Sequence, residues 1–374
     1  MLDLDALLRH AVESRASDVH LKVGARPFLR VDGQLGEAPF ETVGPSDTDG
    51  IVNGLLPQPR AEAFRAGGEV DFVHAVPGLG RFRVSAFRQR GFVGLVLRRV
   101  VPGVPGLEAL GMPAVVGDLA SAPEGLVLVT GLAGSGRTST LAAMVDHVND
   151  RQSCHIVTIE DPIEVLHADK KSIVDQREVG TDTRSYLSAI TKVRHQDPDV
   201  IVIGDVNDAE TAYATLEAAD TGRLVFAGMA TVGAADTVTR ILDLFPPDRR
   251  TPVRLLLTRV LRGVVCQRLL PRAGGRGRSP AVEVLVVNPP VAEALAEPDG
   301  HLRLDELIAE GDFYGMQSFD QSIAALYARG LVERDVAVAH ARHGPTLRVL
   351  LEAADRQRAA VTTPSLPKHA PAPA

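Results

Sequence analysis

The feature that most constrains the fold is a glycine-rich turn between an apolar run and a helical pattern. Residues 125–130 form a short, uninterrupted apolar run of the kind found in buried parallel strands. The turn that follows, residues 131–138, has the sequence GLAGSGRT. Beyond it, apolar residues recur at helical spacing: Leu141, Met144, Val145 and Val148. A strand, a glycine-rich turn and a helix in this order predict an α/β domain with a parallel sheet.

This turn fits the phosphate-binding pattern G-x-x-x-x-G-K-[ST] at every position except the lysine, where the chain has Arg137. Glycines let successive N–H groups face a phosphate, and the following helix adds the positive end of its dipole. Thr138 can place its hydroxyl on magnesium. The flanking strand and helix favour a nucleotide site over a glycine turn that binds nothing. The expected nucleotide-binding residues are Gly131, Gly134, Ser135, Gly136, Arg137, Thr138 and Ser139.

Arg137 keeps the positive charge of the missing lysine but not its shape. A lysine brings a compact, flexible charge to the β and γ phosphates, whereas a guanidinium is planar and bulkier. We therefore expect nucleotide binding to survive while stabilisation of the transition state suffers. The alternative is drift under a coding bias, because only five of the 40 basic residues are lysine. Three of those lysines, at positions 170, 171 and 192, lie in this same domain, so the bias did not remove every lysine there.

The chain is predicted to have two domains, joined by a linker and followed by a tail. Residues 1–101 begin with a helical pattern and continue with alternating apolar and polar residues, which predict a small α+β domain. Residues 102–114 are the expected linker, because they open on the breaker-rich stretch PGVPG. Residues 115–350 carry the glycine-rich turn and further buried-strand runs, which predict the α/β domain. Residues 351–374, rich in alanine and proline, are expected to form a disordered tail.

Composition excludes several other classes of protein. No apolar stretch approaches the roughly 18 to 20 residues that span a bilayer, and the first residues lack the basic start of a signal peptide. Two cysteines, Cys154 and Cys266, are too few for a disulfide framework or a four-cysteine zinc site. A formal net charge of -7 gives no general attraction to nucleic acid or anionic lipid. We therefore expect a cytoplasmic protein that binds no nucleic acid.

Several further stretches occur in the order that one family of proteins shows. Residues 158–164 (TIEDPIE) resemble its acidic box, and residues 197–205 (DPDVIVIGD) resemble its Walker B strand. Residues 227–231 (AGMAT) align with its histidine box. The remaining matches are residues 16–21, 81–84, 261–272 and 315–321. The family that these stretches resemble is the PilT-type pilus retraction ATPases of the type II/IV secretion ATPase superfamily, and the resemblance covers residues 1 to about 350.

The resemblance implies a fold, a cofactor and partners. A smaller α+β domain of the PAS-like type would precede a RecA-like P-loop ATPase domain, an α/β fold. Six subunits would form a ring that binds ATP with Mg²⁺. The ring would be a homo-hexamer or a mixed hexamer with an active paralogue. It would dock on a pilus platform protein at the inner face of the inner membrane and remain peripheral to that membrane.

The resemblance also assigns roles to residues. The implied catalytic residues are Asp205, Glu160 and Glu164. The implied magnesium-binding residues are Thr138 and, through water, Asp161. Without the family context, the acidic residues fit an exposed turn at a strand end equally well. Arginines of a neighbouring subunit would complete the site, and the candidates, which otherwise fit solvated strand positions, are Arg81, Arg83 and Arg98.

Four positions besides Arg137 depart from the family pattern. The Walker B strand ends in Asp205 instead of glutamate, and the shorter side chain moves the carboxylate by about 1 Å, which costs on the order of 100-fold in rate. Asn207 replaces an arginine, and Arg223 and Ala230 replace histidines. Ala230 has no side-chain donor that could sense a γ-phosphate. We expect these changes to fall on one site.

The departures leave three hypotheses open. In the first, the chain is an ATP-binding subunit of a type IV pilus retraction (twitching motility) motor, with hydrolysis impaired by Arg137, Asp205 and Ala230. In the second, it is a fully active hexameric retraction ATPase that converts ATP hydrolysis to pilus disassembly, with Arg137 and Asp205 compensating one another. The third, a translocase acting on nucleic acid, is disfavoured by the acidic net charge.

Overall fold

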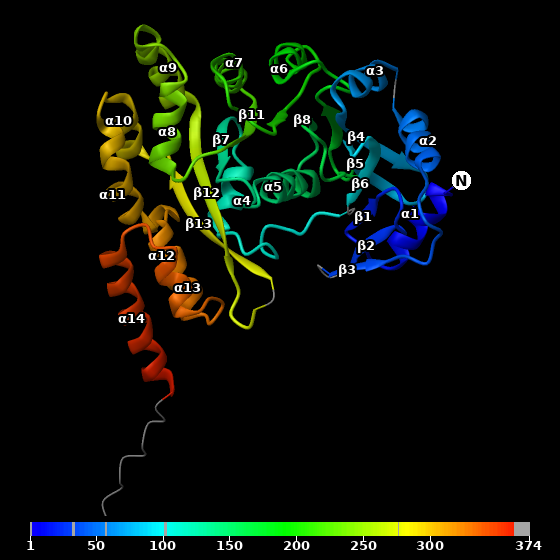
Figure 1. Ribbon diagram of the computed structural model, residues 1–374. Helices are drawn as coiled ribbons and strands as arrows, with labels where there is room; N and C mark the ends of the chain where they lie inside the picture. The colour runs from blue at the N-terminus through cyan, green and yellow to red at the C-terminus, as the bar shows by residue number, and fades with distance from the viewer. Residues whose placement is uncertain (1, 32–33, 57, 101–102, 276, 363–374) are drawn as a thin grey trace, which may run out of the picture. The chain divides into compact units, whose positions relative to one another are not determined.

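The computed structural model describes residues 2–31, 34–56, 58–100, 103–275 and 277–362 (Figure 1). The chain divides into two compact units, Met1–Gly103 and Val104–Ala374, each with its own sheet. Residue 102, at the start of the expected linker, lies outside the described residues.

The N-terminal unit is an antiparallel sheet with helices on one face. Its strands are β1 (Asp18–Leu21), β2 (Phe28–Val31), β3 (Gln34–Glu37), β4 (Glu69–Val76), β5 (Gly80–Gln89) and β6 (Phe92–Val100), in the order β3-β2-β1-β6-β5-β4. Its helices are α1 (Leu4–Glu13), α2 (Pro45–Leu55) and α3 (Gln58–Gly67). Phe82, Val84 and Leu97 are buried in one core with apolar side chains of the helices. The alternation in the sequence therefore places every second residue of β5 in this core, as predicted.

The second unit is a seven-stranded sheet that is parallel except for one edge strand. The strand order is β13-β12-β7-β11-β10-β8-β9, and only β13 runs antiparallel to its neighbour. The strands are β7 (Gly125–Thr130), β8 (His155–Glu160), β9 (Ile173–Glu178), β10 (Val200–Ile203), β11 (Leu224–Met229), β12 (Leu261–Pro271) and β13 (Arg278–Val286). Parallel pairing brings the carboxyl ends of β7, β8, β10 and β11 to the same edge of the sheet.

Helices cover the sheet and extend beyond β13 (Figure 1). They are α4 (Ala114–Ala120), α5 (Arg137–Arg151), α6 (Tyr186–Val193), α7 (Ala209–Ala219), α8 (Ala234–Asp243), α9 (Pro247–Val260), α10 (Pro289–Ala296), α11 (Leu304–Ala309), α12 (Phe319–Ala328), α13 (Arg334–Ala339) and α14 (Gly344–Thr362). Two 3₁₀ turns, η1 (Gly300–Arg303) and η2 (Asp312–Tyr314), flank α11.

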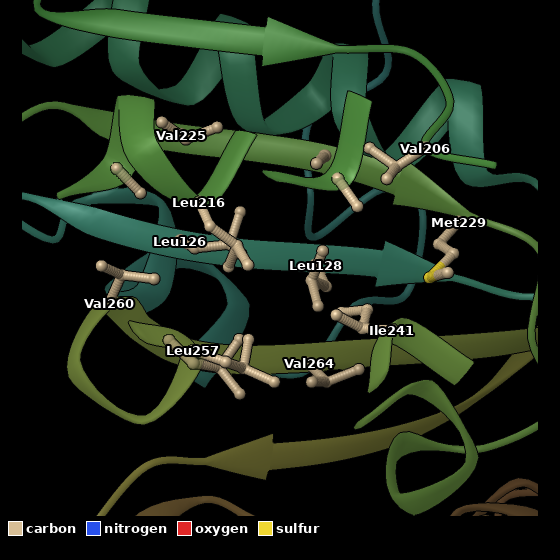
Figure 2. Close-up of a cluster of buried hydrophobic side chains, with 14 of the residues drawn as sticks. Leu126, Leu128, Val206, Leu216, Val225, Met229, Ile241, Leu257, Val260 and Val264 are labelled. Atoms are coloured by element: carbon tan, nitrogen blue, oxygen red, sulfur yellow. The ribbon is translucent and has the colours of Figure 1, made fainter. Parts of the chain in front are cut away.

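The core lies on both faces of this sheet, which explains why β7 is apolar without interruption. Leu126 and Leu128 pack on one face with residues of α7, α8 and α9, and Figure 2 shows them beside Leu216 and Ile241. The alternate residues of β7 pack on the other face with α4 and α5. A strand buried on both faces has no position at which a polar side chain meets water, so the sequence shows a run instead of an alternation.

The expected disordered tail starts later than predicted. Helix α14 continues to residue 362, and within it Leu347 and Leu351 are buried in a cluster that includes Phe319 and Ile323 of α12. Ala354, one turn further along α14, is also buried. This apolar contact holds the segment in a helix despite its alanine-rich composition, so the prediction of disorder is wrong for residues 351–362. The rest of the predicted tail, residues 363–374, lies outside the described residues. Among the described residues, no helix combines the length and the apolar character needed to cross a membrane.

Candidate nucleotide-binding site

A cavity of about 230 Å³ lies at the carboxyl edge of the second sheet. The backbone joins β8 to β10 there, because the N–H of Gly204 donates to the carbonyl of Ile159 at 2.8 Å. Helix α5 forms the other wall. The lining residues are Arg137, Thr138, Leu141, Ala142, Val145, Thr158, Glu160, Asp161, Pro162, Glu164, His167, Tyr186, Val202, Gly204 and Asp205. The structure thus brings together two of the three predicted residues of α5, Arg137 and Thr138, and all four predicted carboxylates.

The glycine-rich loop beside this cavity is held in a conformation that needs its glycines. Gly131, Gly134 and Gly136 have φ of 146°, 77° and 95°, in the left-handed region. A Cβ added to Gly131 would lie 2.5 Å from the carbonyl oxygen of Gln267, and one added to Gly136 would lie 2.9 Å from its side-chain nitrogen. Within the described part of the chain, the N–H groups of Gly134 and Gly136 donate to no other backbone carbonyl. They are available to an anion at the start of α5.

Two glycines of this loop, Gly131 and Gly134, allow a matched test. Gly131→Ala places alanine at positive φ and also forces its Cβ against the backbone of Gln267. Gly134→Ala places alanine at positive φ as well, but its Cβ would have no atom within 4 Å. We expect Gly131→Ala to destabilise the protein by about 3 kcal/mol and to abolish nucleotide binding, and Gly134→Ala to cost about 1 kcal/mol. Urea unfolding and nucleotide titration of both variants provide the measurement. Equal losses in the two variants would contradict a role for the close contact.

Arg137 contacts both the glycine-rich loop and the residue that follows β10. Its Nη1 donates a hydrogen bond to the carbonyl of Gly131, and its Nη2 lies 3.7 Å from Oδ1 of Asp205. The two side chains are 21% and 34% exposed, so the ion pair is partly shielded from water. Arg137 therefore bridges the glycine-rich loop and the end of β10.

The carboxylate of Asp205 is less well solvated than an ordinary aspartate. Its Oδ1 is buried and accepts no hydrogen bond from the described residues. Burial raises the pKa of Asp205, and the guanidinium of Arg137 partly offsets that rise. Arg137 is thus the cation that favours the ionised form of this carboxylate.

Glu160 is buried deeper and is held by two neighbours. Thr158 donates its hydroxyl to Oε1 of Glu160 at 2.6 Å, and the amide of Gln176 donates to the same oxygen at 3.0 Å. Burial raises the pKa of Glu160, an effect that these two hydrogen bonds partly offset. Because both donors use Oε1, the arrangement fixes the orientation of the carboxylate at the end of β8.

The acidic loop after β8 is anchored by side chains of β9. Gln176 donates to the carbonyl of Val165 at 2.8 Å and accepts from the N–H of His167 at 2.9 Å. Glu178, two residues further on the same face of β9, accepts from the N–H of Ile163 at 3.3 Å. The edge strand therefore sets the path of residues 161–167 past the cavity. Neither anchor was predicted from the sequence.

The cavity suits magnesium only in part. The hydroxyl of Thr138 and the carboxylates of Glu160, Asp161 and Glu164 supply the oxygen ligands that this ion prefers. However, within the described residues no group of three or more histidine, cysteine or acidic side chains is close enough to hold a metal ion. The protein groups therefore fit an ion that also takes oxygens from water and phosphate.

Several of the predicted departures lie outside this cavity. Arg223 precedes β11 and donates to the carbonyls of Pro198 and Arg194, at the amino ends of the strands and so at the opposite edge of the sheet. Asn207 and Ala230 are exposed and do not line the cavity. The expectation that all five changes fall on one site is therefore wrong for Arg223, which lies at the opposite edge of the sheet. Asn207 and Ala230 follow β10 and β11 at the carboxyl edge, but of the five only Arg137 and Asp205 line the cavity. Ser139 is also exposed and outside the cavity.

The three candidate arginines of the N-terminal unit share the polar face of its sheet. Arg83 pairs directly with Arg98 across β5 and β6, and Arg81 lies two residues from Arg83. Nε of Arg98 donates to Asp18 at 2.7 Å, and Arg83 lies 3.9 Å from Asp71. Within the described residues, Arg81 makes no ion pair, and its Nε has no hydrogen-bond partner. Of the three arginines, Arg81 is therefore the one without an ion pair to a described residue.

The structure adds residues that sequence reasoning missed. His167 lines the cavity, and its buried Nδ1 has no hydrogen-bond partner among the described residues. Tyr186, at the start of α6, also lines it, and burial together with the nearby carboxylates raises the pKa of its hydroxyl. His167 lies three residues after the acidic box, residues 158–164, and this proximity is the sequence signal for it. Tyr186 comes from a helix that no motif marks.

Comparison with known proteins identifies the family. Residues 81–311 match the family described as Type II/IV secretion system protein. The type IV pilus retractation ATPase PilT of Pseudomonas aeruginosa is 38% identical over 336 residues, which are 90% of this chain and 97% of that protein. The type IV pilus ATPase PilU of the same organism is 36% identical over 351 residues, 94% of this chain and 92% of that protein.

A solved structure agrees with both the fold and the family. The crystal structure of the pilus retraction motor PilT and bound ADP matches with a TM-score of 0.85 at 38% identity, covering 93% of this chain and 100% of that one. The predicted RecA-like ATPase domain preceded by a smaller α+β domain is thereby confirmed. The chain belongs to the type II/IV secretion system protein family, and within it to the PilT/PilU-type type IV pilus ATPases.

Proposed function

We propose that this protein is an ATP-binding subunit of a type IV pilus retraction motor that hydrolyses ATP slowly. The observation that carries the proposal is the position of Arg137, which contacts the Gly131 carbonyl and Asp205. Nucleotide binding is supported by the loop glycines and by the N–H groups of Gly134 and Gly136, which donate to no backbone carbonyl of the described residues. The crystal structure of a 38% identical PilT with bound ADP supports the same ligand class.

Slow hydrolysis follows from the two substitutions that line the cavity. The planar guanidinium of Arg137 is shaped for forked contacts such as those to a carboxylate. It is less able than the ammonium of lysine to give a transferring phosphoryl group a single, flexible point of contact. Asp205 is one methylene shorter than glutamate, so its carboxylate reaches less far toward an attacking water. Thr138 and, through water, Asp161 would hold Mg²⁺, and Glu160, Glu164 and Asp205 would orient the water.

The proposed assembly is a hexameric ring. The relatives named PilT and PilU are pilus ATPases, and a chain with weak hydrolysis fits a mixed ring with an active paralogue as well as a homo-hexamer. Arg81 is the arginine we propose to reach a neighbouring subunit's nucleotide, with Arg83 and Arg98 already held by carboxylates. The ring would work in the cytoplasm, docked on a platform protein of the inner membrane.

A second candidate is a fully active retraction ATPase. The Arg137–Asp205 ion pair at 3.7 Å favours it. Arginine is longer than the lysine of the family pattern and aspartate is shorter than its glutamate, so the two changes in length offset one another. In that case Arg137 holds Asp205 in its working position.

Equilibrium binding and turnover of the natural chain test these proposals. We expect Mg-ATP and ADP to bind, and turnover to be about 0.1 s⁻¹ or less, against a median enzyme rate of about 10 s⁻¹. Fluorescent-nucleotide titration and phosphate release provide the two measurements. Turnover near the median would replace the first candidate by the second, and a chain that binds no nucleotide would overturn both.

A further inference from the structure

Gln267 lies beneath the phosphate loop although it is far from it in sequence. Strand β12 runs parallel to β7, with Cys266 paired to Thr130, the last residue before the loop. Gln267 is therefore the first residue of β12 beyond that pairing. Its side chain is 1% exposed, so its amide is cut off from water and needs partners within the protein.

Both ends of this amide are satisfied by the loop and by helix α5. Nε2 of Gln267 donates to the carbonyl of Ser135 at 2.8 Å, and Oε1 accepts from the hydroxyl of Thr140 at 2.8 Å. The orientation of the amide is fixed, because the reverse placement would set its oxygen against the Ser135 carbonyl. The amide thus ties the loop to the first turn of α5.

The direction of the Ser135 carbonyl decides where the next N–H points. Across a trans peptide the C=O and the following N–H point in opposite directions. A Ser135 carbonyl held toward Gln267 therefore turns the N–H of Gly136 away from Gln267, toward the open side of the loop. The contact is close enough to exclude a larger residue, since a Cβ on Gly136 would lie 2.9 Å from Nε2 of Gln267.

We propose that Gln267 is a positioning residue that shapes the phosphate loop before nucleotide arrives, by holding the Ser135 carbonyl and aiming the Gly136 N–H at a phosphate. The inference rests on the proposed nucleotide-binding function. It assigns to β12 a part in binding the diphosphate portion of the ligand, a class that includes ADP and inorganic pyrophosphate.

Two variants and a matched control test the proposal. Gln267→Met keeps the length of the side chain and removes both hydrogen bonds, and we expect ADP and pyrophosphate affinity to fall about tenfold. Gln267→Glu keeps the shape but sets a carboxylate against the Ser135 carbonyl and under the phosphates, and we expect a loss of about 100-fold. The control is Gln317→Met, because Nε2 of Gln317 also donates to a backbone carbonyl, that of Val282, at 2.7 Å. It should leave both affinities unchanged.

The measurement is ligand affinity by calorimetry on folded protein, far below the unfolding midpoint of each variant. A purely structural glutamine would lower the midpoint but leave affinity unchanged, as expected for Gln317. Unchanged affinity in both Gln267 variants, with the natural chain binding ADP, overturns this inference. A natural chain that binds no ADP overturns the proposed function instead. Should Gln267→Met fail to fold, unchanged ADP affinity in the isosteric Gln267→Glu overturns the inference by itself.

Discussion

The variant that carries Arg137→Lys, Asp205→Glu and Ala230→His is expected to hydrolyse ATP about 100-fold faster than the natural chain, because about 1 Å of carboxylate displacement is worth that much in rate. Arg137 and Asp205 line the cavity and contact each other, so they must be changed together. Ala230 is exposed directly after β11, and a histidine there would supply the side-chain donor for a γ-phosphate that alanine lacks. Steady-state phosphate release beside nucleotide affinity provides the measurement.

Arg137→Lys by itself separates the two candidate functions. If Arg137 compensates for the short Asp205, the shorter lysine moves the positive charge away from that carboxylate, and turnover falls. If the site is impaired, lysine leaves turnover unchanged or raises it. Arg223→His is the matched control, because Arg223 lies at the opposite edge of the sheet and holds backbone carbonyls there. A natural chain that turns over as fast as the triple variant would end the proposal of slow hydrolysis.

The sequence predicts those site residues that lie at or after the carboxyl ends of the parallel strands. The residues after β7, β8 and β10 meet at one edge because those strands are parallel, so the positions of Arg137, Glu160 and Asp205 could be expected together. The same rule shows why Arg223 was misplaced. Arg223 precedes β11, and the beginnings of parallel strands meet at the other edge of the sheet. The match to the histidine box therefore predicts a place in the site for Arg223 that the strand topology excludes.

The supports of the site could not be predicted because they depend on strand register. Gln176 reaches Glu160 only because β9 pairs with β8 so that Gln176 lies beside Thr158. Gln267 reaches Ser135 across 132 residues of sequence because β12 lies next to β7. In contrast, the helical spacing of Leu347, Leu351 and Ala354 predicts that α14 continues, whereas the alanine- and proline-rich composition of the same region predicts disorder.

Arg342→Met is expected to lower the free energy of unfolding by about 3 kcal/mol, because removing one partner leaves an uncompensated buried charge. The charge is Glu283 of β13, whose side chain is 2% exposed and whose Oε1 lies 3.6 Å from Nη1 of Arg342. Glu283 also accepts from the N–H groups of Ala234 and Phe319, at the starts of α8 and α12. These two bonds remain in the variant and keep the loss at the lower end of the range for such pairs.

The control for this prediction is Arg303→Met, which removes an ion pair to Glu297 whose members are 52% and 51% exposed. A pair so exposed is worth less than about 1 kcal/mol, so the midpoint of urea unfolding should move little. Adding Glu283→Gln to Arg342→Met removes the buried charge while keeping an acceptor, and should recover much of the loss.

Burial already raises the pKa of Glu283, and losing Arg342 raises it further. A carboxyl whose pKa is higher in the folded state destabilises as pH rises, so the deficit of Arg342→Met should shrink toward acidic pH. A deficit equal to that of Arg303→Met, or one that grows on acidification, would contradict the account.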